Sequence, residues 1–366
     1  MAPRIGLNLL YLQPGRLGGT ETYAKELLKQ FAAIPNPFEF VLFLNRDSYD
    51  ELQVSGGQFR KILVPIEKGN PLKRIAVEQT VFPGLVRKHG IDVLHSMGYV
   101  CPLFAAARQV ITVHDMLYKR HPEYLPAGKL AFWKIFVPLS ALRAEKVIAV
   151  SETTRQDVLK FLHISADKVV TIHSGVSPTP KATEAQISSV RLRYGLRGSY
   201  LLTVGCGKHK RVDLIEKSLR GVASLQLVVT GLPETGEIPA KPTEGVRYLG
   251  FVSSEDMPAL YAGAAAYITA SEMEGFGFTV LEAMMAETPV ICSSAGSLPE
   301  VCGDAAQIVS EQDSAAYARA IERVCFGNEL REQMIARGKM RVRAFPWRAS
   351  AEEHLSLYAG LSGRNI

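Results

Sequence analysis

The sequence predicts an α/β protein with two domains, each built on a doubly wound parallel sheet. Its 366 residues exceed one average domain and suffice for two, each with its own core. Short apolar runs rich in β-branched residues alternate with helix-length segments along the chain. A polar stretch with two prolines, residues 177–181, separates two such series and is the predicted interdomain linker.

The first series opens as a strand, a glycine-rich turn and a helix. The strand is predicted at Ile5–Leu10, the turn contains Gly15, Gly18 and Gly19, and the helix carries apolar residues at helical spacing up to Phe31. Because most of the later strands are separated by helix-length segments, repeated βα units and a parallel sheet are expected. These further strands are predicted at residues 40–44, 62–64, 93–95, 110–114, 147–150 and 169–172.

The second series repeats this pattern without a repeat in sequence. We therefore expect an N-terminal domain at residues 1–176 and a C-terminal domain at residues 177–345. The last segment, residues 346–366, contains an amphipathic helix pattern that is expected to pack back on the N-terminal domain. The strands of the second series are predicted at residues 200–204, 227–230, 246–249, 266–269, 290–292 and 306–309.

Composition is that of a soluble globular protein, with 47% hydrophobic and 21% charged residues and no low-complexity tract. The five cysteines are an odd number without a CxxC pair or metal-ligand spacing, which predicts reduced thiols and no metal site. The N-terminus lacks the pattern of a signal peptide, and no run approaches twenty apolar residues. A cytoplasmic protein is therefore expected.

The basic excess lies in the first half of the chain. Residues 1–176 carry 22 Lys and Arg against 15 Asp and Glu, whereas residues 177–366 carry 20 against 21. Such asymmetry favours an anionic partner, such as nucleic acid, a phospholipid surface or a phosphorylated substrate, although a scattered solvated surface is an alternative. No zinc finger, RNP-like aromatic motif or recognition-helix pattern supports nucleic acid.

The most informative segment is Glu274–Glu282, which follows the strand predicted at residues 266–269. In open α/β sheets, ligands bind beyond the carboxyl ends of the strands. The glycines of this segment let backbone approach a ligand closely, and a helix is predicted at residues 279–286. The N–H groups of Gly277–Thr279 would form an anion site suited to a diphosphate.

Two glutamates flank this predicted anion site. A carboxylate beside a phosphate is repulsive, so Glu282 makes functional sense only if it accepts hydrogen bonds from hydroxyls such as a ribose diol. Glu274, in the loop, is suited to the hydroxyls of a sugar. The alternative is structural, with Glu274 as a surface loop residue and Glu282 favouring the helix N-terminus through the helix dipole.

The sequence EGFGFTVLEAM at residues 274–284, followed by TPVI at 288–291 and LPEV at 298–301, resembles the retaining glycosyltransferases of family 4. That family has the GT-B architecture, in which two Rossmann-like domains with parallel sheets face each other across a cleft. Its E-x7-E motif matches Glu274 and Glu282 at the right spacing. The resemblance extends through most of the chain and is weakest around residues 50–90 and 181–198.

By this resemblance, Glu274 contacts hydroxyls of the transferred sugar and Glu282 contacts the ribose of the nucleotide. Backbone groups of the motif and of a segment after the strand at 246–249 are implied to meet the donor as well. Those implied to contact the sugar, the phosphates or the nucleobase belong to Gly275, Phe276, Gly277, Phe278, Thr279, Phe251 and Val252.

The N-terminal domain supplies further residues by resemblance. His114 terminates a predicted strand and resembles the family's histidine that faces the donor sugar near its anomeric centre. Gly18, on the acceptor side, and Gly19, near the donor phosphates, resemble the family's glycine loop, and Ser151 resembles a serine that lines the cleft on the acceptor side. Without the resemblance, a histidine at a strand end or a glycine pair is more often structural, as we interpret His95.

A basic loop, Gly205–Arg211, follows the first strand of the second series. A leaving nucleoside diphosphate needs cations to stabilise its developing charge. Family members commonly carry an arginine directly after this glycine, where this chain has Cys206, and a lysine several residues on, which Lys210 matches best. Lys208 and Arg211 are the candidates to replace the arginine, and the alternative is a merely solvated loop.

The resemblance implies a retaining hexosyltransferase that moves a sugar from a UDP-sugar or GDP-sugar to a hydroxyl of a glycan acceptor, in cell-surface or exopolysaccharide assembly. Lysine and helix N–H groups supply the charge stabilisation that Mg²⁺ gives elsewhere, so no metal or other cofactor is expected. The alternatives are an epimerase or phosphorylase of the same architecture and a nucleotide-sugar-binding protein without activity. No G-x-G-x-x-G or P-loop motif occurs after the first strand.

The basic first half suits an acceptor that carries phosphate, such as a polyprenyl-diphosphate-linked glycan at the inner face of a membrane. Peripheral membrane association of a cytoplasmic protein is therefore expected. The stretch Lys129–Arg143 mixes basic and bulky apolar residues, which fits either a helix on a membrane surface or a core-facing helix.

Overall fold

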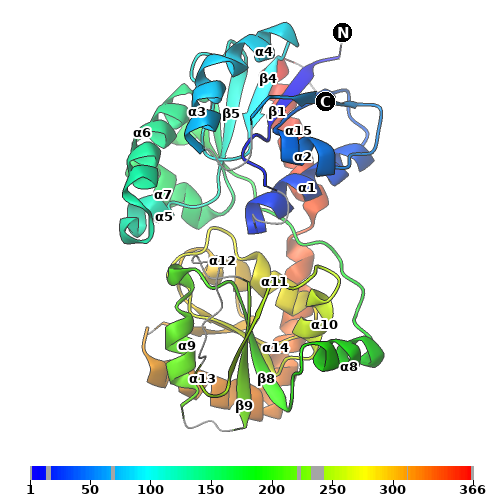
Figure 1. Ribbon diagram of the computed structural model, residues 1–366, viewed down its shortest axis with the longest axis vertical. Coiled ribbons are helices and arrows are strands. Elements are labelled where there is room, and N and C mark those ends of the chain that lie inside the picture. The colour runs from blue at the N-terminus through cyan, green and yellow to red at the C-terminus, as the bar shows by residue number, and fades with distance from the viewer. Residues whose placement is uncertain are drawn as a thin grey trace. The chain divides into compact units, whose positions relative to one another are not determined.

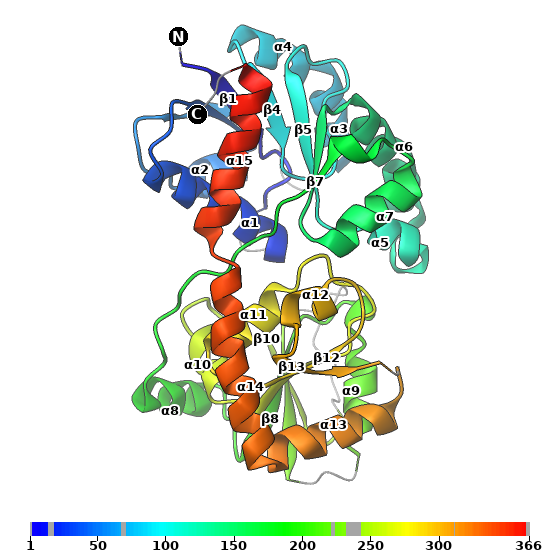
Figure 2. The ribbon, with the colours of Figure 1, turned by 180° about the vertical axis from the view of Figure 1, so that it is seen from behind.

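The computed structural model describes residues 2–13, 18–66, 71–220, 224–231, 243–310 and 312–363. Gly15, in the predicted glycine-rich turn, lies outside these residues. The chain forms two compact units, of which unit 1 comprises Met1–Gly175 with Pro346–Ile366 and unit 2 comprises Val176–Phe345 (Figure 1, Figure 2). Within the described residues, unit 1 holds a seven-stranded sheet and unit 2 a six-stranded sheet, and neighbouring strands run parallel in both.

The sheet of unit 1 has the strand order β3-β2-β1-β4-β5-β6-β7, so β1 pairs with both β2 and β4 and the order reverses at β1. Its strands are β1 (Arg4–Asn8), β2 (Glu39–Leu44), β3 (Phe59–Leu63), β4 (Val93–Ser96), β5 (Arg108–Val113), β6 (Lys146–Ala149) and β7 (Val169–Thr171). Its helices are α1 (Gly18–Ala33), α2 (Arg46–Glu51), α3 (Pro71–Thr80), α4 (Phe82–Lys88), α5 (Leu117–Arg120), α6 (Ala127–Arg143), α7 (Glu152–Leu162) and α15 (Trp347–Ser362), with 3₁₀ helices η1 (Pro122–Tyr124) and η2 (Ala166–Lys168).

Helices cover both faces of this sheet because its strands are apolar on both sides. Phe43 of β2 packs edge-on against Phe82 of α4, with ring centroids 4.8 Å apart. Phe40, an odd number of residues away and so on the opposite face, stacks on Phe31 of α1 at 5.1 Å. The run of apolar residues in β2 therefore serves two cores, which is the pattern of a doubly wound sheet.

The C-terminal helix α15 belongs to unit 1, where it packs against α1 (Figure 2). Its side chains reach into the core of that unit. The hydroxyl of Tyr358 lies 2.6 Å from Nδ1 of His95 on β4, and Nε2 of His95 lies 2.7 Å from Oγ1 of Thr112 on β5. His95 is fully buried and makes two hydrogen bonds, as expected of a structural histidine.

The same hydrogen-bonded chain continues through α1 and back to α15. The Tyr23 hydroxyl lies 3.1 Å from Thr112 Oγ1 and 2.7 Å from Nε2 of His354, whose Nδ1 lies 2.7 Å from the carbonyl oxygen of Ser350. A carbonyl only accepts, so His354 Nδ1 carries the proton and Nε2 accepts from Tyr23. Tyr23 then accepts from Thr112, which accepts from His95 Nε2, so every donor in this buried tyrosine–histidine chain is used once.

The sheet of unit 2 has the strand order β10-β9-β8-β11-β12-β13. Its strands are β8 (Ser199–Val204), β9 (Leu225–Thr230), β10 (Val246–Gly250), β11 (Ala266–Thr269), β12 (Val290–Ser293) and β13 (Ala306–Val309). Its helices are α8 (Glu184–Arg193), α9 (Val212–Ser218), α10 (Met257–Ala262), α11 (Phe278–Met285), α12 (Leu298–Cys302), α13 (Ser314–Phe326) and α14 (Asn328–Arg341), with 3₁₀ helices η3 (Lys208–Lys210) and η4 (Val342–Ala344).

This second sheet is also covered on both faces. Ile268 of β11 packs into a core with Ile215 of α9 and Tyr317 of α13. Tyr267, the preceding residue of β11, points the other way, and its ring centroid lies 5.8 Å from that of Tyr261 on α10. Both sheets thus have the doubly wound arrangement that the sequence predicts.

Each predicted strand is present. The largest difference between a predicted and an observed strand end is three residues, at β3, which begins at Phe59 rather than Ile62. Strand β5 ends at Val113, so His114 directly follows the strand instead of terminating it. Among the residues described, no helix is both long and apolar enough to cross a membrane.

Candidate active site

The candidate donor site of unit 2 lies where the strand order of its sheet reverses. Strand β8 pairs with β9 on one side and β11 on the other, which makes the β8/β11 boundary a topological switch point. The loops that leave the carboxyl ends of β8 and β11 therefore meet, and ligands of α/β folds bind at such points. These loops carry the basic segment Gly205–Arg211 and the motif Glu274–Glu282.

Lys210 and Glu274 form a largely buried ion pair between these two loops. Lys210 Nζ lies 2.5 Å from Glu274 Oε1, with 15% and 13% of the two side chains exposed. Ser271 Oγ donates to the same oxygen at 2.6 Å. Burial alone would raise the pKa of Glu274, but the Lys210 ammonium and the two hydrogen bonds outweigh it and hold the pKa below its usual value. Glu274 is therefore an ionised carboxylate in a sheltered site.

The backbone of Glu274 is fixed from the opposite side by residues 296 and 297. Ser297 donates to the Glu274 carbonyl from its backbone N–H at 3.0 Å and from its hydroxyl at 3.1 Å. Gly296 has a φ of +58°, and a Cβ there would lie 2.3 Å from the Glu274 carbonyl oxygen. Only glycine fits this position, because any side chain would push the loop away.

The start of α11 has the geometry of an anion site. Gly277 adopts a left-handed φ of +96°, and no side chain caps the first turn in the part of the chain that the structure describes. The first turn of α11 also carries the partial positive charge of a helix N-terminus, which favours a bound anion. The Phe276 ring is buried against Phe278 and Phe345, so its side chain is not exposed to a ligand.

Thr279 and Glu282 lie within the first turns of α11. The Thr279 hydroxyl accepts from the Tyr267 hydroxyl at 2.8 Å, and Glu282 Oε2 accepts from the Tyr261 hydroxyl at 2.9 Å. Burial raises the pKa of Glu282, and the hydrogen bond from Tyr261 opposes that rise. Glu282 and Tyr261 line a cavity of about 220 Å³ that Met257 also lines. The Glu282 carboxylate is thus oriented by one hydroxyl and borders a cavity.

The basic loop holds its three cations differently. Lys210 is bound to Glu274, whereas Arg211 binds Glu272 at 2.7 Å and Asp213 at 3.1 Å, which raises its pKa. Lys208, at the start of η3, is exposed. Of the two candidates to replace the family arginine, Lys208 is the one that these carboxylates do not hold.

Cys206 turns away from the cation positions. Its Sγ lies 3.2 Å from the Gly231 carbonyl oxygen and 3.5 Å from that of Thr230, and burial raises the pKa of the thiol to about 11. The side chain is therefore a neutral thiol packed at the end of β9.

The residues after β10 lie at the carboxyl end of the sheet, as the loops after β8 and β11 do. Phe251 is exposed and Val252 is buried.

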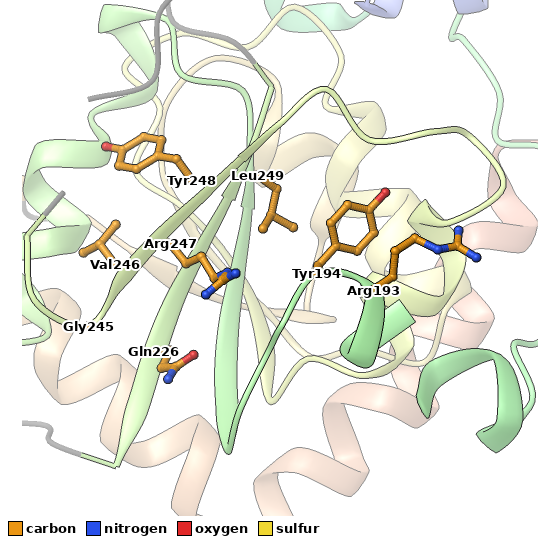
Figure 3. A pocket seen from close by; sticks show the side chains of 8 residues that line it. All are labelled: Arg193, Tyr194, Gln226, Gly245, Val246, Arg247, Tyr248 and Leu249. Atoms are coloured by element: carbon orange, nitrogen blue, oxygen red, sulfur yellow. The ribbon is translucent and has the colours of Figure 1, made fainter. Parts of the chain in front are cut away.

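A separate hollow of about 490 Å³ runs along β10, an edge strand, and Figure 3 shows Arg193, Tyr194 and Arg247 around it. None of the predicted donor-binding residues lines this hollow, so it is not the predicted site.

His114 of unit 1 is buried directly after β5. Its Nε2 lies 2.8 Å from the carbonyl oxygen of Met97, and the Tyr23 ring packs edge-on at 5.0 Å. Burial lowers the pKa of His114, so the ring is neutral with the proton on Nε2 and an acceptor at Nδ1. Asp115 instead accepts from the Leu117 backbone N–H at 2.9 Å, so the two adjacent residues have different partners.

The other candidates of unit 1 begin helices. Gly18 and Gly19 form the first turn of α1, and the position of a Cβ on Gly18 is open space. Ser151 is fully buried and caps α7, because its Oγ accepts from the Thr154 backbone N–H at 3.1 Å. That cap explains a serine at this position without a ligand.

Several residues that support the site carry no sequence pattern of their own. Ser271 contacts Glu274 three residues further on, whereas Tyr261 reaches Glu282 across 21 positions and Ser297 reaches Glu274 across 23. Only the glycine before Ser297 offered a signal, because a glycine after a strand often marks a close backbone approach. Within the described residues, no group of three or more His, Cys, Asp or Glu side chains is placed to hold a metal ion.

Comparison with known proteins identifies the family of the chain. Residues 201–341 match the family model described as Glycosyl transferases group 1, and residues 17–179 match the model described as Glycosyltransferase Family 4. The chain is 27% identical to O-antigen chain mannosyltransferase B of Escherichia coli, over 93% of this chain and 96% of that protein. It is 25% identical to O-antigen chain mannosyltransferase RfbU of Salmonella typhimurium, over 59% and 60%.

Solved structures share the fold. Sucrose-phosphate synthase from Thermosynechococcus elongatus superposes with a TM-score of 0.78 at 18% identity, covering 99% of each chain. Anabaena HepE in complex with UDP and glucose gives 0.73 at 17% identity, covering 98% of this chain and 100% of that one. With two Rossmann-like units, each matched by its own family model, the chain belongs to glycosyltransferase family 4 and has the GT-B fold.

Proposed function

We propose that this protein transfers a hexose from a UDP-sugar or GDP-sugar to a hydroxyl of a polysaccharide acceptor, with retention of the anomeric configuration. The observation that carries the proposal is the convergence of Lys210, Glu274 and the start of α11 at the β8/β11 switch point, with Glu282 one turn further on. An ionised carboxylate, an ammonium and the positive end of a helix are the elements that a sugar diphosphate requires.

Lys210 stabilises the leaving diphosphate in this proposal. An ammonium has three donors, so Lys210 can keep its bond to Glu274 and still donate to a phosphate oxygen. The N–H groups of Gly277, Phe278 and Thr279 share the developing negative charge with Lys208 of the basic loop. Gly19 is a further proposed phosphate contact, by resemblance alone. These groups supply charge stabilisation without a divalent metal, and a strict Mg²⁺ requirement in an activity assay would contradict that part of the proposal.

The two glutamates bind hydroxyls rather than phosphate. Glu274, held ionised by Lys210 and Ser271, accepts from hydroxyls of the transferred sugar. Glu282 accepts from the ribose diol, because the Tyr261 hydroxyl occupies Oε2 and orients the carboxylate. The backbone of Gly275 and Phe276 lies along the sugar, and that of Phe251 and Val252 meets the base.

His114, in unit 1, is a neutral ring with an acceptor at Nδ1. Such a ring accepts a hydrogen bond from a sugar hydroxyl but supplies no second carboxylate nucleophile. We therefore propose a same-face reaction in which the leaving phosphate takes the acceptor proton. Gly18 and Ser151 are proposed to shape the acceptor side.

A mannosyl donor is favoured by the relatives, two of which are named O-antigen chain mannosyltransferases. The acceptor would then be a growing glycan, carried on a polyprenyl diphosphate, and the basic half of the chain suits such an acceptor.

Titration calorimetry with UDP-, GDP-, ADP- and TDP-sugars tests the donor site. We expect one nucleotide class to bind, Glu282→Ala to weaken it by tenfold or more, and Glu322→Ala, an exposed glutamate on α13, to bind as the wild type does. If no sugar nucleotide binds the wild type, the donor-site proposal is wrong.

Product analysis tests the reaction. NMR of the product should show the anomeric configuration of the donor, and an inverted product would overturn the retaining mechanism. Incubation without acceptor separates the rivals, because an epimerase would convert the donor alone and a phosphorylase would need phosphate. A protein that binds the donor yet yields neither transfer nor slow hydrolysis would be the non-catalytic alternative.

A further inference from the structure

Helix α6 (Ala127–Arg143) is apolar on two faces. Val137 and Ala141 are buried in the core of unit 1. On the outer side, Ile135, Leu139 and Leu142 recur at helical spacing with 55%, 42% and 58% of their surface exposed. The sequence fits either a core-facing or a surface helix, and the structure shows a helix that packs through one face and exposes a second apolar stripe.

Phe104 extends this stripe beyond the end of the helix. It is 79% exposed, and its loop is tied to α6 by Arg143, whose Nε donates to the Leu103 carbonyl at 3.1 Å and whose guanidinium donates to the Ala105 carbonyl at 2.7 Å. Four of the nine large hydrophobic side chains that are exposed among the described residues therefore gather on α6 and the loop beside its end. We call Phe104, Ile135, Leu139 and Leu142 the α6 outer face.

Cations lie along α6 and beside its C-terminal end. The helix carries Lys129, Lys134 and Arg143 and no acidic residue between Ala127 and Arg143. At its C-terminal end, Lys168 Nζ donates to the Leu142 carbonyl at 2.8 Å and Lys146 Nζ donates to the Asp167 carbonyl at 2.6 Å. The carboxylates that neighbour this end of the helix in sequence or contact are Glu145 and Asp167, so the cations outnumber them.

We propose that the α6 outer face docks on an anionic lipid bilayer. The four apolar side chains enter the boundary between headgroups and acyl chains, while Lys129, Lys134 and Lys168 contact anionic headgroups. Lysine stems extend along such a boundary and keep the ammonium in water. A protein partner fits less well, because the core of a protein interface is depleted in lysine. The +7 excess of residues 1–176 supplies attraction over a longer range.

This inference goes beyond the proposed function, because docking needs neither donor nor acceptor. The two are therefore tested separately: a variant that loses docking should still bind the sugar nucleotide, since the α6 outer face lies in unit 1 and the candidate donor site in unit 2.

Vesicle flotation tests the apolar part. The full chain is mixed with vesicles of equal parts phosphatidylglycerol and phosphatidylcholine, or of phosphatidylcholine alone, and the floated fraction is measured. We expect binding to the anionic vesicles, weakened by tenfold or more in Ile135→Gln/Leu142→Gln. The matched control is Leu192→Gln, an 84% exposed leucine on α8 of unit 2, which should bind as the wild type does.

Charge variants and salt test the electrostatic part. Lys134→Gln should weaken binding by roughly fivefold, and its control Lys217→Gln, on an exposed lysine of unit 2, should not. Raising the salt concentration should weaken wild-type binding for the same reason. Circular dichroism and sugar-nucleotide calorimetry confirm that each variant is folded.

Two outcomes would overturn the proposal. The first is wild-type protein that does not float with anionic vesicles, or Ile135→Gln/Leu142→Gln that floats as well as the wild type. The second is a wild-type dimer in sedimentation that the same substitutions convert to a monomer without vesicles, because the α6 outer face would then bind a second copy of the chain.

Discussion

Lys210 Nζ contacts Glu274 Oε1 at 2.5 Å, so a cation from the loop after β8 is held by a carboxylate from the loop after β11. The pair joins the two proposed catalytic roles, one toward the leaving diphosphate and one toward the sugar. Because both side chains are largely buried, removing either leaves the other without its counter-charge.

Replacing Lys210 by Met should lower the free energy of unfolding at neutral pH by about 2 kcal/mol, since Glu274 then stays buried and ionised without its cation. In the wild type the pKa of Glu274 is lowered, so its contribution is present above the unfolded pKa and is lost as pH falls through the folded one. In Lys210→Met the pKa should rise, and the deficit should shrink on acidification. Urea denaturation at about pH 7 and about pH 5 measures this, with Lys217→Met as the control. An equal deficit at both pH values would argue against an ionised Glu274.

Donor binding should depend on the protonation of Glu282. Its pKa is raised by burial, and only the ionised form accepts from both ribose hydroxyls, so sugar-nucleotide affinity should fall as pH falls through that raised pKa. Tyr261→Phe removes the hydrogen bond that opposes the rise, so the fall should move to higher pH. Calorimetry between about pH 8 and about pH 5 tests both, and a Tyr261→Phe profile that coincides with the wild-type profile would exclude this role for Tyr261.

The loop of Glu274 should tolerate no side chain at residue 296. Gly296→Ala should cost about 2 kcal/mol or more and abolish donor binding, because its Cβ would lie 2.3 Å from the Glu274 carbonyl oxygen at a left-handed φ. Gly198→Ala is the matched control, with a similar φ of +66° and no atom within 4 Å of its Cβ. It should show only the cost of the backbone conformation, about 1 kcal/mol, and keep donor binding. Thermal unfolding and calorimetry would contradict the argument if the two variants behaved alike.

The buried tyrosine–histidine chain should make unit 1 sensitive to acid. Burial lowers the pKa of His354 to about 4, so its contribution to stability is present above the unfolded pKa and is lost as pH falls from there toward the folded value. The loss from this one histidine is about 3 kcal/mol at most. Denaturant unfolding of His354→Leu should therefore show a shallower decline with acidification than the wild type. Leu355→Ala, which removes a buried side chain of the same helix without removing a titratable group, should leave the slope unchanged.

Much of the fold could be predicted because it depends on local pattern. The apolar runs of β1 and β11 mark strands by themselves, and the apolar residues Val280, Leu281 and Met284 at helical spacing indicate the helix that follows Gly277. The Lys210–Glu274 pair could not be derived in this way, because the two residues are 64 positions apart and meet only once β8 and β11 are neighbours.

The same limit applies to the C-terminal helix and to α6. Contact between His95 and Tyr358 spans 263 positions, and nothing local to either residue indicates the other. The two apolar stripes of α6 look alike in sequence, because periodicity shows which residues share a face but not which face meets the core. Only the assembled unit distinguishes Val137, which is buried, from Ile135, which is exposed.

The membership of α15 in unit 1 has a consequence for biosynthesis. Unit 2 is encoded without interruption by residues 176–345, whereas unit 1 needs residues 346–362 before Tyr23 and His95 acquire His354 and Tyr358 as partners. Unit 1 therefore cannot complete its core until residues 346–362 have been synthesised, after all of unit 2. A nonsense codon shortly before residue 346 would keep every side chain of the proposed donor site in unit 2. The truncated chain would still lack helix α15, which completes the core of unit 1.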